Sequence, residues 1–301
     1  MSHVLTLIAP PGQLPPAIIG RARDALSALG ADLGTPDWLA GAEAVDLPFS
    51  RLNPEQAVAA LRAVLQSEPV DAIAQPAEGR RKALLIADMD STIVTSETLD
   101  ELAAYAGLKE RVAEITRRSM NGELDFSAAL RERVAMLKGL SLDALEATWK
   151  ETRLMPGARA LVRTMSAHGA HCALASGGFT FFTGRVAQLC GFQSHHSNTL
   201  LDNGKVLAGT VAEPIFDRDA KLATLTHLAA EKGLPLSATM AVGDGANDLA
   251  MIGAAGLGVA YRAKPVVASA ARARVDHADL RALLYAQGYR AADIASDGPA
   301  G

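Results

Sequence analysis

The chain has 301 residues, of which 49% are hydrophobic and 21% charged, and its formal net charge is −4. This composition is typical of a globular protein, and the length predicts roughly two domains. An acidic chain without a basic block argues against a nucleic-acid partner, and no apolar run is long enough to span a bilayer. Cys172 and Cys190 are too few for a disulfide framework, so we expect a reducing, cytoplasmic location.

The first 75 residues predict a small α+β domain. Apolar, β-prone runs alternate with two segments in which apolar residues recur at helical spacing. The predicted order is strand, helix, strand, helix, strand, over 4–8, 16–29, 44–49, 54–66 and 70–74. Asn53 is the expected N-cap of the second helix, because Pro54 follows it in the first turn. Residues 76–82, which include three consecutive basic side chains, indicate a solvated linker.

The stretch 83–92 (ALLIADMDST) is a continuous apolar run that ends abruptly in Asp88 and Asp90. Such a run is typical of a buried parallel strand, and open α/β sheets bind ligands at the carboxyl ends of their strands. Two carboxylates held close together repel each other unless a cation or a shared proton compensates them. The stretch alone leaves two interpretations open: a metal-assisted or acid–base site, or a strand end where two aspartates cap the next helix.

Helical periodicity without an intervening strand follows over 96–152, and we expect this insertion to cover the first strand's carboxyl end as a cap. The α/β alternation of a core formed by 83–95 and 153–290 then resumes, which predicts a Rossmann-like parallel sheet. We expect residues 291–301 to be a flexible tail. The later strands are predicted at 172–175, 239–242, 257–260 and near Val275, with a hairpin over 199–210.

Three of these strands end in polar clusters, which a parallel sheet would bring to one edge. The clusters are Asp88 with Asp90, Ser176 with Gly177 and Gly178, and Asp244 with Asn247 and Asp248. Carboxylates without a nearby cysteine pair favour Mg²⁺ over Zn²⁺. A serine hydroxyl, backbone N–H groups and Lys221 suit a phosphoryl group, which aspartate can also accept covalently. Each feature alone has an ordinary explanation, such as a tight turn, a solvated lysine or a capping pair.

Four motifs together resemble those of the haloacid-dehalogenase-like (HAD) phosphatase superfamily, in order and in spacing. They are DMDST at 88–92, SGG at 176–178, Lys221, and GDGANDL at 243–249. Within the cap, Glu97, the run MNGELDF at 120–126 and Arg133 are similar to the substrate-recognising segment of phosphoserine phosphatases. The resemblance covers residues 82–286. The N-terminal domain resembles the small ACT-type domains of some family members, with one strand hard to find.

The resemblance implies hydrolysis of O-phospho-L-serine to L-serine and phosphate through an aspartyl-phosphate, the last step of serine biosynthesis. It implies that Asp88 is the nucleophile and that Asp90 is the general acid and base. It also implies Mg²⁺ held by an Asp88 oxygen, the Asp90 backbone carbonyl and Asp244. The implied phosphoryl-binding residues are Ser176, Gly177, Lys221 and Asn247, with Asp248 supporting the lysine.

Phosphoserine carries an ammonium and a carboxylate in addition to its phosphate. The resemblance implies that Glu97 pairs with the ammonium and Arg133 with the carboxylate, while Met120 and Phe126 close the pocket. Without the resemblance, Glu97 and Arg133 would be interpreted as an exposed helix ion pair.

Two other functions stay open at this point. The same chemistry could act on another small phosphomonoester or transfer the phosphoryl group to an alcohol. Alternatively, a regulatory protein could sense serine through the N-terminal domain and keep the phosphatase fold as a scaffold, although a sensor needs no nucleophile. An amino-acid effector of the N-terminal domain and a homodimer are further expectations.

Overall fold

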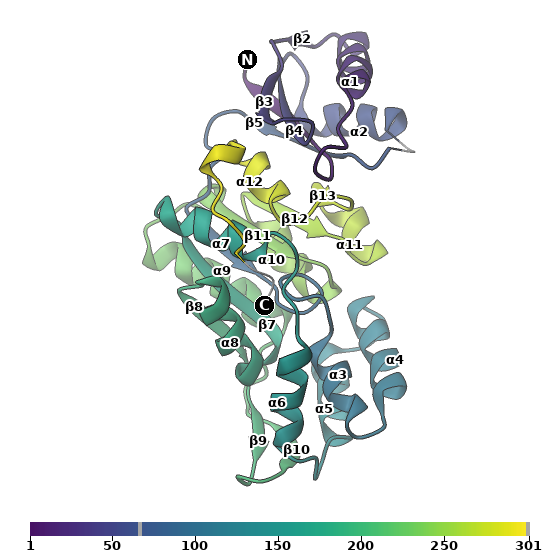
Figure 1. The fold of residues 1–301 in the computed structure, drawn as a ribbon, viewed down its shortest axis with the longest axis vertical. Helices are drawn as coiled ribbons and strands as arrows, with labels where there is room; N and C mark the ends of the chain where they lie inside the picture. Colours follow the sequence, from purple (N-terminus) through teal and green to yellow (C-terminus); the bar gives the residue numbers. More distant parts are fainter. Residues whose placement is uncertain (66–67, 299–301) are drawn as a thin grey trace.

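The computed structural model describes residues 1–65 and 68–298. An N-terminal domain, an α/β core and a helical cap follow one another along the long axis of the molecule (Figure 1). The predicted helix end at Gln66 and the last tail residues, 299–301, lie outside the described residues.

The N-terminal domain is an antiparallel sheet with two helices, α1 (Pro16–Ala28) and α2 (Pro54–Val64), packed on one face. The strand order is β2-β4-β1-β5, and β3 also pairs with β4, which gives a split βαβ topology. The three predicted strands and both helices are confirmed, and Asn53 forms a capping box with Gln56. The strands are β1 (His3–Ile8), β2 (Asp32–Leu33), β3 (Asp37–Ala40), β4 (Ala44–Ser50) and β5 (Asp71–Pro76).

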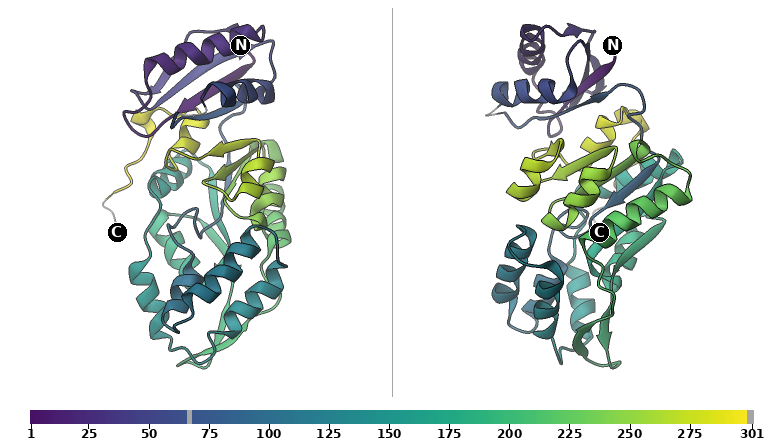
Figure 2. Two further views of the ribbon diagram at one scale, coloured as in Figure 1. Left: turned by 90° about the vertical axis from the view of Figure 1, so that its right-hand side faces the viewer. Right: turned by 180° about the vertical axis from the view of Figure 1, so that it is seen from behind.

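The second face of this sheet packs on the core domain. Ile8 and Ile73 belong to the same apolar cluster as Leu283 and Tyr285 of α12 (Ala282–Ala286). Figure 2 shows this helix, in yellow, between the N-terminal domain and the core. One hydrophobic core therefore extends across the boundary between the two domains.

The prediction of a solvated linker holds for residues 76–79 and for Arg81, which are exposed, and is wrong for Arg80 and Lys82. Arg80 forms a 2.6 Å ion pair with the buried Asp46. Arg81 lies over the ring of Tyr289, 4.3 Å from its centroid. Lys82 is buried and donates hydrogen bonds to two backbone carbonyls.

The core is a six-stranded parallel sheet in the order β13-β12-β11-β6-β7-β8. Helices α7 (Ala158–Ala167), α8 (Thr180–Cys190) and α12 cover one face. Helices α9 (Arg218–Glu231), α10 (Leu249–Ala254) and α11 (Pro265–Ala270) cover the other. The strands are β6 (Leu84–Ala87), β7 (His171–Phe179), β8 (Ser194–Asn198), β11 (Thr239–Gly243), β12 (Leu257–Tyr261) and β13 (Ala273–Val275), and single-turn helices lie at η1 (Leu236–Ala238) and η2 (Ala246–Asp248).

The cap consists of α3 (Thr98–Ala104), α4 (Lys109–Met120), α5 (Phe126–Ala135) and α6 (Asp143–Glu151), all inserted between β6 and α7 as expected. The predicted hairpin is also present, as β9 (Leu200–Asp202) and β10 (Leu207–Val211). It extends from the core along the cap, where Leu207 exchanges backbone hydrogen bonds with Gly139 and Leu140. Among the described residues, no helix has the length and apolar character needed to cross a membrane.

Residues 291–298, predicted as part of a flexible tail, contact the core in this structure. A single helical turn, η3 (Ala291–Asp293), is followed by Ala295, whose N–H donates to the Thr164 hydroxyl at 2.9 Å. The Asp297 carboxylate then accepts the N–H groups of Gly157 (2.6 Å) and Ala160 (2.9 Å). It thereby caps α7, whose own N-cap residue provides no side-chain hydrogen bond.

Candidate active site

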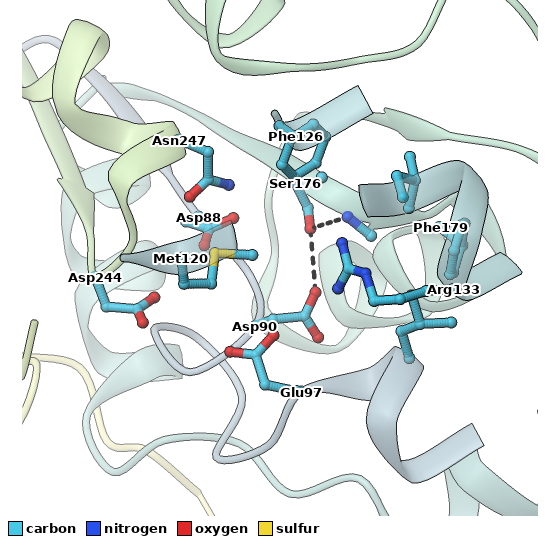
Figure 3. A pocket seen from close by; sticks show the side chains of 14 residues that line it. Asp88, Asp90, Glu97, Met120, Phe126, Arg133, Ser176, Phe179, Asp244 and Asn247 are labelled. Carbon is cyan, nitrogen blue, oxygen red and sulfur yellow. Dashed lines mark hydrogen bonds between the residues drawn. The ribbon is translucent and has the colours of Figure 1, made fainter. Parts of the chain in front are cut away.

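The predicted convergence of three strand ends is confirmed, because β11, β6 and β7 are neighbours in the sheet. A pocket lies at their carboxyl ends beneath the cap (Figure 3). Ten of the twelve residues predicted for the site line it; Lys221 and Asp248 are fully buried and do not line it. The ten are Asp88, Asp90, Glu97, Met120, Phe126, Arg133, Ser176, Gly177, Asp244 and Asn247.

Lys221 bridges two buried carboxylates. Its ammonium group lies 2.6 Å from Asp88 Oδ1 and 2.7 Å from Asp248 Oδ1. Burial by itself would lower the pKa of Lys221, but the charges of Asp248 and Asp88 outweigh it and raise that pKa above its ordinary value. The other oxygen of Asp248 accepts the N–H groups of Asp244 and Gly245, both at 3.1 Å. Lys221 is therefore charged, and Asp248 holds it in place.

The carboxylates at this sheet edge outnumber the compensating cations. Oxygen atoms of Asp88, Asp244 and Asp248 lie within 4.8 Å of one another, in a fully buried group. Burial raises the pKa of Asp88 and of Asp244 well above the ordinary value, and neighbouring carboxylates add to both increases. Because Asp248 is already bonded to Lys221, the oxygens of Asp88 and Asp244 are the pair best suited to a hard divalent cation.

Asp90 faces a different part of the pocket. Its Oδ1 accepts the Thr98 N–H at 2.8 Å, and its Oδ2 lies 3.4 Å from the Ser176 hydroxyl, which in turn accepts the Gly178 N–H (Figure 3). Burial, followed by the charge of Glu97, raises the pKa of Asp90 to about 7. A carboxyl group with this pKa can both donate and accept a proton near neutral pH.

Glu97 and Arg133 both line the pocket, and among the described residues no ion pair joins them to each other. Glu97 accepts a 2.7 Å hydrogen bond from Ser91, a residue with a left-handed backbone (φ 56°). Arg133 is 3% exposed and is held by the Thr116 hydroxyl at 2.8 Å. The interpretation of Glu97 and Arg133 as an exposed helix pair is therefore wrong.

Met120 and Phe126 close the pocket from the cap side. A Cβ at Gly177 would lie 2.5 Å from the Phe126 ring, and one at Gly245 would lie 2.7 Å from the Met120 sulfur. The two glycines therefore let these cap side chains approach the core backbone closely. Asn247 is buried beside it, and its Oδ1 has no hydrogen-bond partner among the described residues. That oxygen is available to a ligand.

Several residues of the site were not predicted. Asn198 donates to the Gly177 carbonyl at 2.9 Å and accepts the Phe216 N–H at 2.7 Å, so it fixes the backbone of the SGG motif. It lies at the end of β8, an edge strand whose polar sequence does not predict a strand. The SGG motif itself belongs to β7 and is not a turn. The remaining lining residues are Leu99, Leu130, Gly178 and Phe179.

Comparisons with known proteins agree with this geometry. A phosphoserine phosphatase of Streptomyces coelicolor is 44% identical over 209 residues, which make up 69% of this chain and 51% of that protein. The chain thus spans about half the length of this relative. A solved HAD family hydrolase from Salmonella enterica serovar Typhi has a TM-score of 0.82 at 29% identity, covering 95% of this chain and 98% of its own.

A second solved structure, a phospho-aspartyl intermediate analogue of phosphoserine phosphatase, has a TM-score of 0.66 at 36% identity. The match covers 68% of the present chain and 98% of the chain in the solved structure. The family model for haloacid dehalogenase-like hydrolases matches residues 82–256, which is more than half of the sequence. The chain therefore belongs to the haloacid dehalogenase-like hydrolase family.

Proposed function

We propose that this protein is a Mg²⁺-dependent phosphatase that hydrolyses O-phospho-L-serine to L-serine and phosphate. The observation that carries the proposal is the placement of Glu97 and Arg133, unpaired with each other, in one pocket with Asp88 and Asp90. A carboxylate and a guanidinium on the cap complement the ammonium and carboxylate of an amino acid. The names of the relatives reported above support the same substrate.

In the proposed reaction, an oxygen of Asp88 attacks phosphorus, and the bond from phosphorus to the serine oxygen breaks. Asp90 gives its proton to the departing oxygen. It then takes a proton from the water that attacks the aspartyl-phosphate, which releases phosphate and regenerates Asp88. The pKa of Asp90, about 7, suits both steps, because each leaves Asp90 in the state that the other requires.

The cation would be held by the carboxylates of Asp88 and Asp244 and by the backbone carbonyl of Asp90. When bound, it would offset the negative charge of the phosphoryl oxygens and of the crowded carboxylates. Ser176 and the Gly177 N–H are our candidates for binding phosphoryl oxygens, together with Lys221 and Asn247. The charge of Lys221 opposes the burial that raises the pKa of Asp88, and its hydrogen bond orients that carboxylate.

A substrate panel tests the proposal. We expect phosphate release from O-phospho-L-serine to exceed release from glycerol phosphate or p-nitrophenyl phosphate, to stop in EDTA and to return with Mg²⁺. The variant Asp88→Asn should lose activity by at least about a thousandfold while keeping the circular dichroism spectrum of the wild type. Equal rates across the panel would favour another small phosphomonoester or an alcohol acceptor, and activity in Asp88→Asn would contradict the nucleophile assignment.

We also propose that the N-terminal domain is ACT-like and binds an amino-acid effector, which its split βαβ topology supports. Calorimetric titration of the full chain with serine, after saturation of the active site with phosphate, would detect such a site. Absence of saturable heat would contradict it. The homodimer, the cytoplasmic location and the role in serine biosynthesis stay predictions.

A further inference from the structure

The guanidinium of Arg133 is held from behind, on the side away from the pocket. Its Nη1 donates to Thr116 Oγ1 at 2.8 Å, and its Nε donates to the Ala129 carbonyl at 3.2 Å. Among the described residues, no group accepts a hydrogen bond from Nη2. Figure 3 shows the guanidinium pointing into the pocket toward Asp90. The second terminal nitrogen is therefore available to a ligand.

Thr116 connects this guanidinium to a second buried charge. Its hydroxyl lies 2.6 Å from Asp100 Oδ1 and 3.1 Å from the Val112 carbonyl, and it donates to the nearer, charged acceptor. A hydroxyl has one hydrogen to donate, so donation to Asp100 turns its lone pairs toward Arg133. The three residues come from α5, α4 and α3, and their exposed fractions are 3%, 3% and 7%. They form a directional chain from arginine through hydroxyl to carboxylate across the cap.

This chain prevents a competing arrangement. The carboxylates of Asp90 and Glu97 line the same pocket and already act on the charge of Arg133. An arginine released from Thr116 would be drawn toward these charges and away from the position in which it faces a substrate carboxylate.

We propose that Asp100 and Thr116 are positioning residues that aim Arg133 at the carboxylate of the substrate. They thereby set the preference for phosphoserine over phosphate esters that lack a carboxylate. The inference rests on the proposed function and extends it to two residues that do not line the pocket.

The variant Thr116→Val tests the proposal, because it removes the hydroxyl and keeps a branched side chain. We expect KM for O-phospho-L-serine to rise about tenfold with kcat within about twofold of the wild type, the effect of one lost charge-assisted hydrogen bond. With O-phosphoethanolamine, which has the ammonium but no carboxylate, kcat/KM should stay within about twofold. Thr116→Ser keeps the hydroxyl and should restore KM for phosphoserine.

A matched control is Thr148→Val, which removes another buried hydroxyl of the cap, one that donates to the Ala144 carbonyl at 2.8 Å. It should leave KM unchanged for both esters. Equal losses on both esters in Thr116→Val, or failure of Thr116→Ser to restore KM, would overturn the positioning role.

The variant Arg133→Ala separates this proposal from the proposed function. A selective loss on phosphoserine in Arg133→Ala but not in Thr116→Val would reject the positioning role and leave the function standing. If the wild type shows no preference for phosphoserine and Arg133→Ala affects both esters alike, the proposed function itself fails.

Discussion

Asp100 is a carboxylate buried between cap helices, and this burial makes its ionisation less favourable than in water. Burial raises its pKa to about 6 from an ordinary value of 3.8, although the Thr116 hydroxyl and Arg133 both lower it. Nothing in the local sequence distinguishes this residue, because Asp100 sits in a helical segment where an aspartate ordinarily faces solvent. Its role depends on which helix faces it, and that is decided by the packing of the cap.

The raised pKa of Asp100 predicts a pH dependence of stability. Between about pH 4 and pH 6 the folded chain binds more protons at this residue than the unfolded chain, so the free energy of unfolding falls as pH rises through that window. The fall is on the order of 2–3 kcal/mol, the free energy that corresponds to a pKa raised from 3.8 to about 6. Above the window this contribution is constant.

Urea unfolding of the metal-free wild type and of Asp100→Asn, measured from pH 4 to pH 8, checks this prediction. Asparagine has no titrating group, while the other acids of the site contribute to both proteins. The wild-type curve should therefore fall relative to the Asp100→Asn curve up to about pH 6 and then run parallel to it. Parallel curves throughout, or a relative rise, would contradict the raised pKa.

The aspartates of the first and last motifs could be predicted because both groups follow a strong strand signal. Leu84 to Ala87 and Thr239 to Gly243 are continuous buried runs, so the polar residues after them stand at a sheet edge. Strands β2, β3 and β8 lack this signal. They are short or polar and lie toward sheet edges, where pairing with a neighbour and not side-chain burial defines the strand. The roles of Thr116 and Asn198 could not be predicted either, because their hydrogen-bond partners belong to other elements of the fold.

The β9–β10 hairpin contacts the cap, and Gly209 lies at one of these contacts. This residue has φ 78°, and a Cβ there would lie 2.7 Å from Lys138 Cβ and 3.2 Å from its Cα. Gly204, at the tip of the same hairpin, has φ 84° with no atom within 4 Å. Substitution of Gly204 therefore tests backbone strain alone, and substitution of Gly209 tests backbone strain together with contact with the cap.

We expect Gly204→Ala to lower the free energy of unfolding by about 1 kcal/mol, the cost of left-handed backbone for alanine. Gly209→Ala should cost about 3 kcal/mol, because overpacking against Lys138 adds to the same strain. Urea unfolding in a Trp38→Phe background, followed by the fluorescence of Trp149 in α6 of the cap, measures both values. Equal losses in the two variants would show that the hairpin does not bear on the cap.

At the scale of the whole molecule, the predictions that differ from the structure concern contacts between segments far apart in sequence. The linker and the tail have the polar composition of solvated chain, yet Arg80 and Asp297 each satisfy groups in another part of the fold. The composition of a segment shows whether it is compatible with exposure to water, but it does not show which other segment packs against it. The same limit applies to Asp71, whose buried carboxylate accepts the N–H groups of residues 276–278 from the core.

This Asp71 contact predicts that the N-terminal domain and the core unfold together. The chain has two tryptophans, Trp38 in the N-terminal domain and Trp149 in the cap, so single-tryptophan variants follow each part separately. In the wild type, both probes should report one urea midpoint, because one apolar core spans the boundary. In Asp71→Ala, three backbone N–H groups lose their acceptor, at a cost of about 2–4 kcal/mol.

We therefore expect the Trp38 transition of Asp71→Ala to move to lower urea than the Trp149 transition. The matched control is Asp37→Ala, which breaks another contact between the domains, the 2.7 Å ion pair with Arg290. Both of those side chains are about half exposed, so the loss should stay below about 1 kcal/mol and both midpoints should remain together. Coincident midpoints in Asp71→Ala would mean that the shared apolar core alone couples the domains. An equal separation of the midpoints in Asp37→Ala would mean that the burial of the Asp71 contact does not matter.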